Sequence, residues 1–436
     1  MKKTGNSRRF WLALVIFSLV GQVAWVVENM YLNVFIYKMF KASASQISLM
    51  VAASSVAATV TTLLIGSLSD KLGKRKVFIC GGYLCWGVSI LCFGLIREEW
   101  LGGLLPATVS AATVGISLVI ILDCIMTFFG SAANDACFNA WLTDSTDATN
   151  RGAAEGINAM MPLMAILVVF GGFMGLNQDL PESWTTIFFI IGGVVMALGA
   201  VGFFLIQEPK VDTAQNQSVW KNIIHGFRPN VIRANPRLYL TLIAYGVFGI
   251  SINIFMPYLI LYYDETLGMD NYVLIFAPAI IMAAAFTAFY GRVYDKKGFV
   301  PSVMVSLLLL MAGYVLLYVF RHTALVFAGT VLMMCGYLSG MAVFGAMIRD
   351  NTPENKSGMF QGQRIICQVL IPGIIGPAIG AAVLKNAEKI VDSDGRQVFL
   401  PNANIFLAAL IAAVFIFVAL LPLVKNLRKK GTDHAG

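Results

Sequence analysis

The chain has 436 residues, of which 58% are hydrophobic and only 12% are charged, and its mean hydropathy is +0.77. Soluble domains carry about 25% charged residues, so this composition excludes a soluble globular protein. The formal net charge of +8 would fit a nucleic-acid partner, and the positions of the basic residues decide whether it does.

Apolar segments of membrane-spanning length follow one another along almost the whole chain. A helix needs about 20 apolar residues to cross the hydrocarbon layer. Twelve segments satisfy this length, and we expect helices at 10–36, 44–66, 76–96, 113–142, 154–176, 185–206, 238–263, 272–291, 300–320, 324–348, 358–383 and 402–424. The predicted fold is an all-α integral membrane protein of twelve transmembrane helices.

Basic residues gather in alternate connections between these segments, beginning with Lys2, Lys3, Arg8 and Arg9 and continuing in 71–76. Cytoplasmic loops carry such an excess of Lys and Arg. The pattern predicts a multi-pass protein of a bacterial inner membrane or plasma membrane, with both termini cytoplasmic. The positive charge then meets anionic lipid, and no nucleic-acid partner is expected.

An internal repeat divides the chain. Gly66, Asp70 and Gly73 stand in the turn after the second span with the same spacing as Gly291, Asp295 and Gly298 after the eighth, and a basic residue follows each aspartate. A second pair, around Asp144 and Asp350, follows the fourth and tenth spans. We therefore predict two pseudo-symmetric six-helix bundles, 1–206 and 238–436, joined by a cytoplasmic linker at 207–237 with a short interfacial helix at 219–227. The first half is longer over 97–116, as an extended outer segment or an overlong fourth helix.

The two Gly-x-x-x-Asp-basic-x-Gly turns resemble the signature loop of the major facilitator superfamily. The resemblance covers the whole chain and implies a secondary transporter that works by alternating access, the two bundles rocking about a central site. It also implies a gating role for Asp70, Arg75 and Asp295, with Asp70 facing a helix N-terminus of the other bundle as a latch of the outward-open state. The alternative is a solvated turn that only obeys the charge rule.

The stretch 133–142 at the end of the fourth span is similar to that of the glycoside–pentoside–hexuronide:cation symporters of the melibiose permease type. In that group an aspartate at the position of Asp135 serves sugar and coupling cation. The sodium-binding carboxylates of the second span would fall at Ala58 and Thr62, and neither is acidic. The departure favours a proton over sodium as the coupling ion.

Ionisable residues inside spans are the best pointers to a transport pathway, because each costs roughly 2.5–3.5 kcal/mol at mid-helix on insertion scales. Glu28 lies about halfway along the first span, with Trp25 and Asn29 beside it. Burial disfavours the charged form of a carboxyl, which suits proton exchange. The alternative is a glutamate that only joins neighbouring helices.

The fourth span carries a polar stripe at helical spacing: Asp123, Thr127, Ser131, Asn134, Asp135 and Asn139. We expect Asp135, Asn134 and Asn139 to serve coupling or substrate binding. Asp123 is expected near the outer boundary, either as an interfacial residue or as a second candidate for coupling or substrate binding.

The second half has no acidic residue deep in a span. Its candidate ligand-binding residues are hydrogen-bonding and aromatic: Asn253, Tyr258, Tyr337, Arg364 and Gln368. Arg364 has a second interpretation as a headgroup anchor. Pro257 and Pro372 are expected to loosen their helices.

Amides, Trp and Tyr suit a neutral polyhydroxylated ligand, since hydroxyls need donors and acceptors and ring faces stack on sugar C–H surfaces. We therefore predict a monomeric, proton-coupled symporter of a sugar or glycoside. A drug/proton antiporter of the same superfamily is the alternative, although the proline of its Gly-Pro signature is missing from the fifth span and a similar run, Gly373 to Gly380, lies in the eleventh. A membrane sensor or enzyme would need an output domain or reactive cluster, and we expect neither, nor a cofactor or metal.

Overall fold

The computed structural model describes residues 7–106, 108–146, 150–208, 227–269, 271–352, 357–391 and 395–432. The chain divides into two compact units, Met1–Val219 (unit 1) and Trp220–Gly436 (unit 2). The described residues contain 12 helices long and apolar enough to cross a membrane, six in each unit. The predicted fold class is confirmed. The interfacial helix predicted at 219–227 lies outside the described residues except for Phe227.

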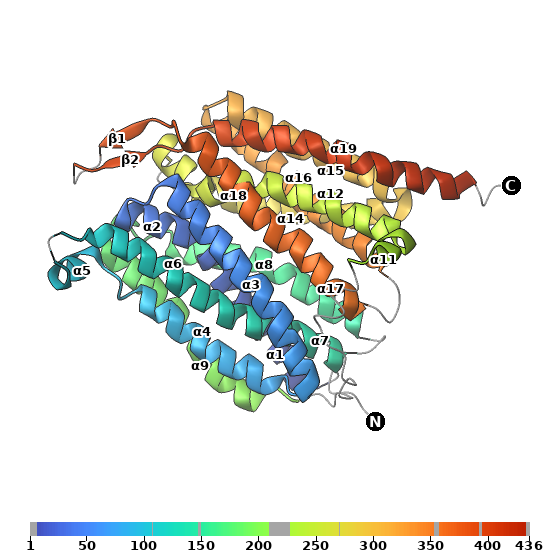
Figure 1. Ribbon diagram of the computed structural model, residues 1–436, viewed down its shortest axis with the longest axis horizontal. Helices are drawn as coiled ribbons and strands as arrows, with labels where there is room; N and C mark the ends of the chain where they lie inside the picture. The colour runs from blue at the N-terminus through green and yellow to red at the C-terminus, as the bar shows by residue number, and fades with distance from the viewer. Residues whose placement is uncertain are drawn as a thin grey trace. The chain divides into compact units, whose positions relative to one another are not determined.

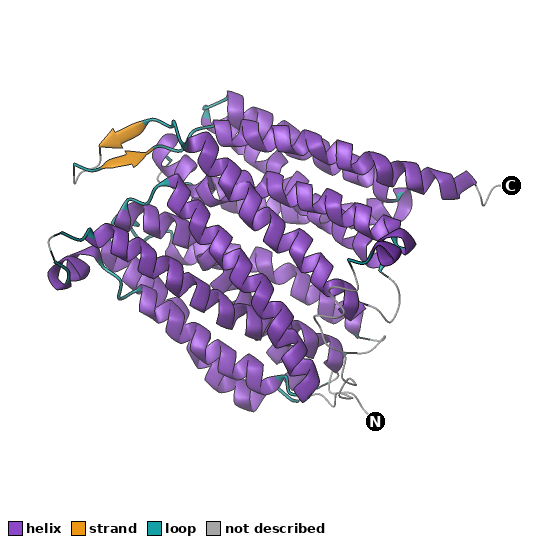
Figure 2. Ribbon diagram, in the orientation of Figure 1, coloured by secondary structure: helices purple, strands orange, loops and turns teal. Residues whose placement is uncertain are grey.

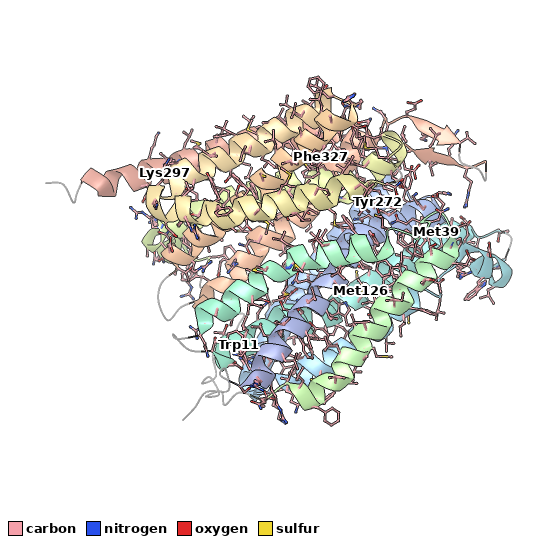
Figure 3. All side chains as sticks on the ribbon, turned by 180° about the vertical axis from the view of Figure 1, so that it is seen from behind. Trp11, Met39, Met126, Tyr272, Lys297 and Phe327 are labelled. Carbon is pink, nitrogen blue, oxygen red and sulfur yellow. The ribbon has the colours of Figure 1, made fainter. Side chains whose placement is uncertain are left out.

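In unit 1 the first span is built from three consecutive helical segments and reaches from Arg8 to Phe40. Figure 3 labels Trp11 near its start and Met39 near its end, at opposite ends of the unit. The helices of unit 1 (Figure 1) are α1 (Arg8–Val26), η2 (Val27–Tyr31), α2 (Leu32–Phe40), α3 (Ala44–Leu72), α4 (Lys76–Phe93), α5 (Glu98–Leu104), α6 (Ala111–Gly130), η3 (Ser131–Phe138), α7 (Asn139–Ser145), α8 (Arg151–Phe173) and α9 (Pro181–Leu205).

Unit 2 repeats this pattern of long helices with interruptions. Its elements are α11 (Pro229–Ala234), α12 (Pro236–Phe255), η4 (Met256–Tyr258), α13 (Leu259–Leu261), η5 (Tyr262–Thr266), α14 (Val273–Lys297), α15 (Phe299–Val319), α16 (Thr323–Asn351), α17 (Ser357–Ile365), η6 (Ile366–Leu370), α18 (Ile371–Leu384), β1 (Lys389–Val391), β2 (Gln397–Phe399) and α19 (Asn404–Thr432).

Local sequence signals set where these helices begin and end. Ser43 and Gln46 form a capping box at the start of α3, in which each side chain accepts a hydrogen bond from the backbone N–H of the other residue. Gly73 ends the same helix with φ 62°, in the left-handed region that glycine reaches without steric cost. Pro181 and Pro236 start α9 and α12, because proline is favoured in the first helical turn.

The internal repeat appears in the packing. In unit 1, α1 packs on α8 and α9, α3 packs on α6, and α4 packs on α9 and α6. In unit 2 the matching helices pair in the same way: α12 packs on α18 and α19, α14 packs on α16, and α15 packs on α19 and α16. Small residues permit the close approaches, since a Cβ on Gly87 of α4 would lie 2.4 Å from the backbone nitrogen of Met196 in α9.

Two features depart from a simple twelve-helix chain. Over 97–116 the extra residues form the separate short helix α5, and they also lengthen the fourth span, which begins at Ala111. Between α18 and α19, β1 and β2 pair antiparallel, with Ile390 opposite Val398. Figure 2 shows this hairpin beyond the end of the helices of unit 2. The sequence did not predict it, because its strands have only three residues each.

Candidate functional site

The candidate carboxyls of unit 1 lie in π-helical turns. The turn η2 interrupts the first span and carries Glu28, and η3 interrupts the fourth span and carries Asn134 and Asp135. In unit 2 the turn η6 carries Gln368. Turns of this kind are rare and are frequent at functional sites. The helix irregularities therefore coincide with the residues that the sequence singled out.

Asparagine side chains bond to backbone carbonyls at these turns. Asn29 donates through Nδ2 to the Trp25 carbonyl at 2.8 Å, and Asn33 donates to the Asn29 carbonyl at 2.9 Å. Asn139 donates in the same way to the Asp135 carbonyl at 3.0 Å. The amides of Asn29 and Asn139, expected to contact ligand, thus hold the backbone next to Glu28 and Asp135. Both side chains are exposed.

Glu28 is buried, with 7% of its surface exposed, and its Oε1 accepts a hydrogen bond from Thr127 Oγ1 at 2.8 Å. Asp123 precedes Thr127 by four residues, so it lies one turn away on the same face of α6. Asp123 is 2% exposed and acts electrostatically on Glu28. The protein encloses the Asp123 side chain near Glu28, which favours the coupling role over the interfacial one.

Asp135 accepts from two neighbours on its own turn, Ser131 Oγ at 3.1 Å and Asn134 Nδ2 at 3.5 Å. Asn134 Oδ1 in turn accepts from the Tyr83 hydroxyl of α4 at 3.0 Å. That hydroxyl also lies within 2.9 Å of the Phe17 carbonyl of α1. A hydrogen-bonded chain therefore connects η3 with α4 and α1.

Aromatic rings pack tightly around this chain. The Trp25 and Trp86 rings lie 5.1 Å apart, and Tyr83 stands edge-on to Trp86 at 5.4 Å. A Cβ on Gly130 would lie 2.8 Å from Trp86, and one on Gly21 would lie 2.5 Å from the Tyr83 hydroxyl. Glycine at these two positions is what allows the rings to approach α6 and α1.

The spans of unit 2 contain a group of aromatic side chains, whereas those of unit 1 contain carboxyls. The rings of Tyr245 and Phe344 stack at 5.2 Å, Phe248 lies 5.4 Å from Phe344, and Tyr337 stacks on Phe248 at 6.5 Å. Arg364 lies near enough to act electrostatically on the Tyr245 phenol. This side of the chain presents ring faces, hydroxyls and one guanidinium.

The remaining candidates of unit 2 lie close to that group or pack the helices. Arg364 is exposed, and its Nε donates to Gln368 Oε1 at 3.0 Å. Asn253 is half-buried and donates to the Gly249 carbonyl at 2.9 Å. Tyr258 is fully buried, and its hydroxyl lies 3.5 Å from the Pro377 carbonyl, which ties α12 to α18.

The glycine–proline run of the eleventh span has a packing role. A Cβ on Gly376 would lie 2.5 Å from the Asn253 Cβ, and one on Gly380 would lie 2.3 Å from the Ile254 carbonyl oxygen. The run therefore lets α18 press directly on α12, as small residues do in membrane helices.

The turn between α3 and α4 holds a network around one arginine. Arg75 Nη2 pairs with Asp70 Oδ1 at 2.5 Å and Arg75 Nε pairs with Asp144 Oδ2 at 3.0 Å. The guanidinium also donates to Ser69 Oγ, and the backbone N–H of Arg75 donates to Glu208 Oε1, both at 2.5 Å. Burial lowers the pKa of Arg75, but Asp70 and then Asp144 outweigh it, and the pKa is raised above its ordinary value.

The matching turn of unit 2 lacks this network. Asp295 is exposed, and the position matching Arg75 is occupied by Val300. Asp350, the counterpart of Asp144, instead accepts from the Tyr294 hydroxyl at 2.5 Å. The two turns share a sequence pattern, but among the residues that the structure describes only the first is cross-linked by charge.

Sequence reasoning missed two residues that lie next to the candidate residues of unit 1. Tyr83 and Trp86 come from α4, which has no acid or amide inside its span and gave no signal. Within the described ranges, no group of three or more His, Cys, Asp or Glu is arranged to hold a metal ion. The groups present can exchange protons and can bind hydroxyls.

Comparison with known proteins agrees with the helix pairing. The model of the Major Facilitator Superfamily matches residues 10–377. No curated protein matches the sequence. Three solved structures are similar: a mutant of the nucleoside transporter NupG (14% identity, 94% of this chain and 99% of that chain covered, TM-score 0.71), a bacterial homolog of the human lysosomal transporter Spinster (16%, 95% and 96%, 0.69) and the xylose transporter XylE from E. coli (13%, 94% and 98%, 0.65).

Proposed function

Since this chain belongs to the Major Facilitator Superfamily, we propose that it is a secondary active transporter that carries a sugar or glycoside together with a proton by alternating access. One observation carries the proposal. Glu28 and Asp123 are buried and Asp135 is half-buried within the spans of unit 1, where Thr127 donates to Glu28 and Ser131 donates to Asp135. Packing alone does not require such groups, whose insertion costs roughly 2.5–3.5 kcal/mol each.

A polyhydroxylated substrate is supported by the side chains around the carboxyls and in unit 2. Asn, Gln, Tyr and Trp supply donors, acceptors and ring faces. A xylose transporter and a nucleoside transporter have similar folds, and the substrates in their names carry several hydroxyl groups. We also propose the melibiose permease type as the subgroup, a monomer as the working form, and both termini on the cytoplasmic side.

Gating is assigned to the turn between α3 and α4. Asp70 and Arg75 are proposed to form an interaction there that is made and broken during the transport cycle. Asp295 is proposed to have the corresponding, weaker role in the matching turn of unit 2. The paired geometry of Asp70, Arg75 and Asp144 supports an ordered element at this turn.

The test is uptake by proteoliposomes of labelled pentoses, hexoses, glycosides and nucleosides, with and without an imposed pH gradient. We expect accumulation of at least one sugar or glycoside driven by the gradient, and its loss in Glu28→Gln. Export of cationic dyes without sugar uptake would instead establish the second candidate, a drug/proton antiporter, for which a buried carboxyl in the first span is equally suitable.

A further inference from the structure

Three buried polar atoms of unit 1 are left without a hydrogen-bond partner in one region of the fold. They are Glu28 Oε2, Asp123 Oδ1 and the indole nitrogen Nε1 of Trp86. An enclosed polar atom without a partner costs about 1–3 kcal/mol, and more when it is charged. Such a group of atoms indicates that something absent from the protein chain completes it.

The contacts place these atoms around one segment of α6. Thr127 bonds to Glu28, Asp123 lies one turn earlier on the same face, and Gly130 lies against both indoles. Of all charged groups, Asp123 acts most strongly on Glu28. The two carboxyls are therefore neighbours. In each of them one oxygen lies next to a hydroxyl group, and the other oxygen has no hydrogen-bond partner.

The surroundings offer no compensating positive charge. The other titratable groups that act on the pair or are acted on by it are Asp135 of η3 and Cys124 of α6. In the described part of the chain neither Glu28 nor Asp123 forms an ion pair. Two like charges at close range in a dry site do not both stay ionised. A proton bound by the pair would remove this repulsion.

We propose that Glu28 and Asp123 form a carboxyl pair that shares a single proton, and that this proton is the coupling ion of the transport cycle. That the pair binds a proton does not depend on the proposed function. That this proton is the coupling ion rests on the proposed function. One proton suffices for both unpartnered oxygens, since the carboxylic acid O–H of one residue becomes the donor and the carboxylate oxygen of the other becomes the acceptor.

Release of this proton would leave two negative charges in an enclosed site. The pair therefore gives up its proton only when water or a ligand donor reaches it, and this requirement links proton release to a change of conformation. A sodium ion is the competing occupant. It would need about six oxygen ligands, by analogy with other hard cations. The hydroxyls close to the pair are those of Thr127 and Ser54, and they already donate to Glu28 and to the Val51 carbonyl.

The experiment compares Glu28→Gln, Asp123→Asn and the double variant in proteoliposomes, with Glu99→Gln on the exposed helix α5 as the matched control. Uptake driven by a pH gradient and exchange at equal concentrations (counterflow) are measured with the substrate found in the panel. We expect each single variant to lose more than tenfold in driven accumulation while counterflow remains. The double variant should lose no more than either single one, because the two carboxyls act as a unit. The control should match the wild type.

A second measurement needs no substrate. Tryptophan fluorescence of the purified protein in lipid nanodiscs is followed while the pH is varied, since Trp25 and Trp86 lie against the same segment of α6. We expect a pH transition in the wild type that disappears in the double variant and persists in Glu99→Gln.

Three outcomes would overturn the pair: full pH-driven accumulation in Asp123→Asn, accumulation driven by a sodium gradient instead of a pH gradient, or an unchanged fluorescence transition in the double variant. If the wild type transports no compound of the panel while the fluorescence transition behaves as expected, the proposed function fails and the proton-sharing pair stands.

Discussion

The helices of units 1 and 2 pair in the same way, but the side chains inside their spans differ in chemical type. In unit 1 the carboxyls of Glu28, Asp123 and Asp135 lie within the first and fourth spans. In the spans of unit 2 the acidic residues stand near helix ends, at Asp264, Glu265, Asp295 and Asp350, and the middle is occupied by aromatic rings. The same packing is thus reached with and without internal carboxyls.

The contrast extends to the turns that define the repeat. Arg75 joins two carboxylates in unit 1, whereas the corresponding turn of unit 2 has Val300 and a hydrogen bond from Tyr294 to Asp350. The difference indicates that charge is a local specialisation of unit 1, added to a framework that packs without it. Changing charged groups in unit 1 should therefore alter transport more than it alters the fold. Matched changes in unit 2 should leave both transport and the fold unaltered.

Among changes outside the Glu28–Asp123 pair, the largest effect is expected from Asp135→Asn. Asparagine keeps the shape and can still bond to Ser131, but it can no longer carry a proton or a charge. We expect gradient-driven accumulation to fall by more than about tenfold, the scale of one lost charge-assisted interaction. Uptake by proteoliposomes measures it, and Ser131→Ala is the control that keeps the carboxyl. An equal loss in both variants would mean that the bond, and not the carboxyl, matters.

The next effect concerns stability and comes from Arg75→Met. The Arg75 side chain is 4% exposed, and its removal leaves two carboxylates without their partner. Breaking a buried pair costs about 3–5 kcal/mol. Asp70 is 52% exposed, however, so solvent screening reduces the expected loss to about 1–3 kcal/mol. Thermal unfolding in detergent measures it, and Lys296→Met on the exposed end of α14 should leave the protein unchanged.

The pH dependence of this loss has a definite sign. Burial lowers the pKa of Arg75, whereas Asp70 and Asp144 raise it. The net result in the folded protein is a raised pKa. The contribution of Arg75 to stability is then fully present below the pKa of an unfolded arginine, which lies in the strongly alkaline range, and is lost only as the pH rises through the higher pKa of the folded state. The difference between Arg75→Met and the wild type should stay constant between about pH 7 and pH 10. A difference that vanishes toward pH 10 would contradict this assignment.

The sequence predicted the twelve spans to within a few residues, because hydropathy and span length leave little freedom in a membrane. It also singled out Glu28 and Asp135 as candidates, since an acid inside an apolar segment stands out. It left the role of Asp123 open, because depth along a helix does not reveal which neighbour encloses a side chain. Tyr83 and Trp86 were missed for a related reason: an aromatic residue in a span has the same sequence signal whether it packs or contacts a site.

The sequence did not predict the irregular helical turns either. The bond from Asn29 to the Trp25 carbonyl holds the turn that carries Glu28, and the bond from Asn253 to the Gly249 carbonyl is its counterpart in unit 2, where no carboxyl follows. Each bond is worth about 0.5–1.5 kcal/mol. We expect Asn29→Ala to shift the pH profile of driven uptake and lower its rate about fivefold, while Asn253→Ala leaves the profile in place. Uptake measured across a pH series tests this, and equal profiles in both variants would reduce Asn29 to a structural residue.

The smallest effect is expected in the aromatic group of unit 2. Tyr337 stacks on Phe248, and Tyr337→Phe keeps the ring but removes the hydroxyl, so the packing of α12 and α16 should not change. If unit 2 contacts the substrate through hydroxyls, loss of one uncharged hydrogen bond raises KM about two- to fivefold. The accumulation ratio driven by the pH gradient should remain that of the wild type, because no carboxyl is touched. Concentration series of labelled substrate separate the two quantities. A Tyr337→Phe variant that keeps its KM but loses accumulation would show that coupling extends into unit 2, and the division of chemistry between the units would then be wrong.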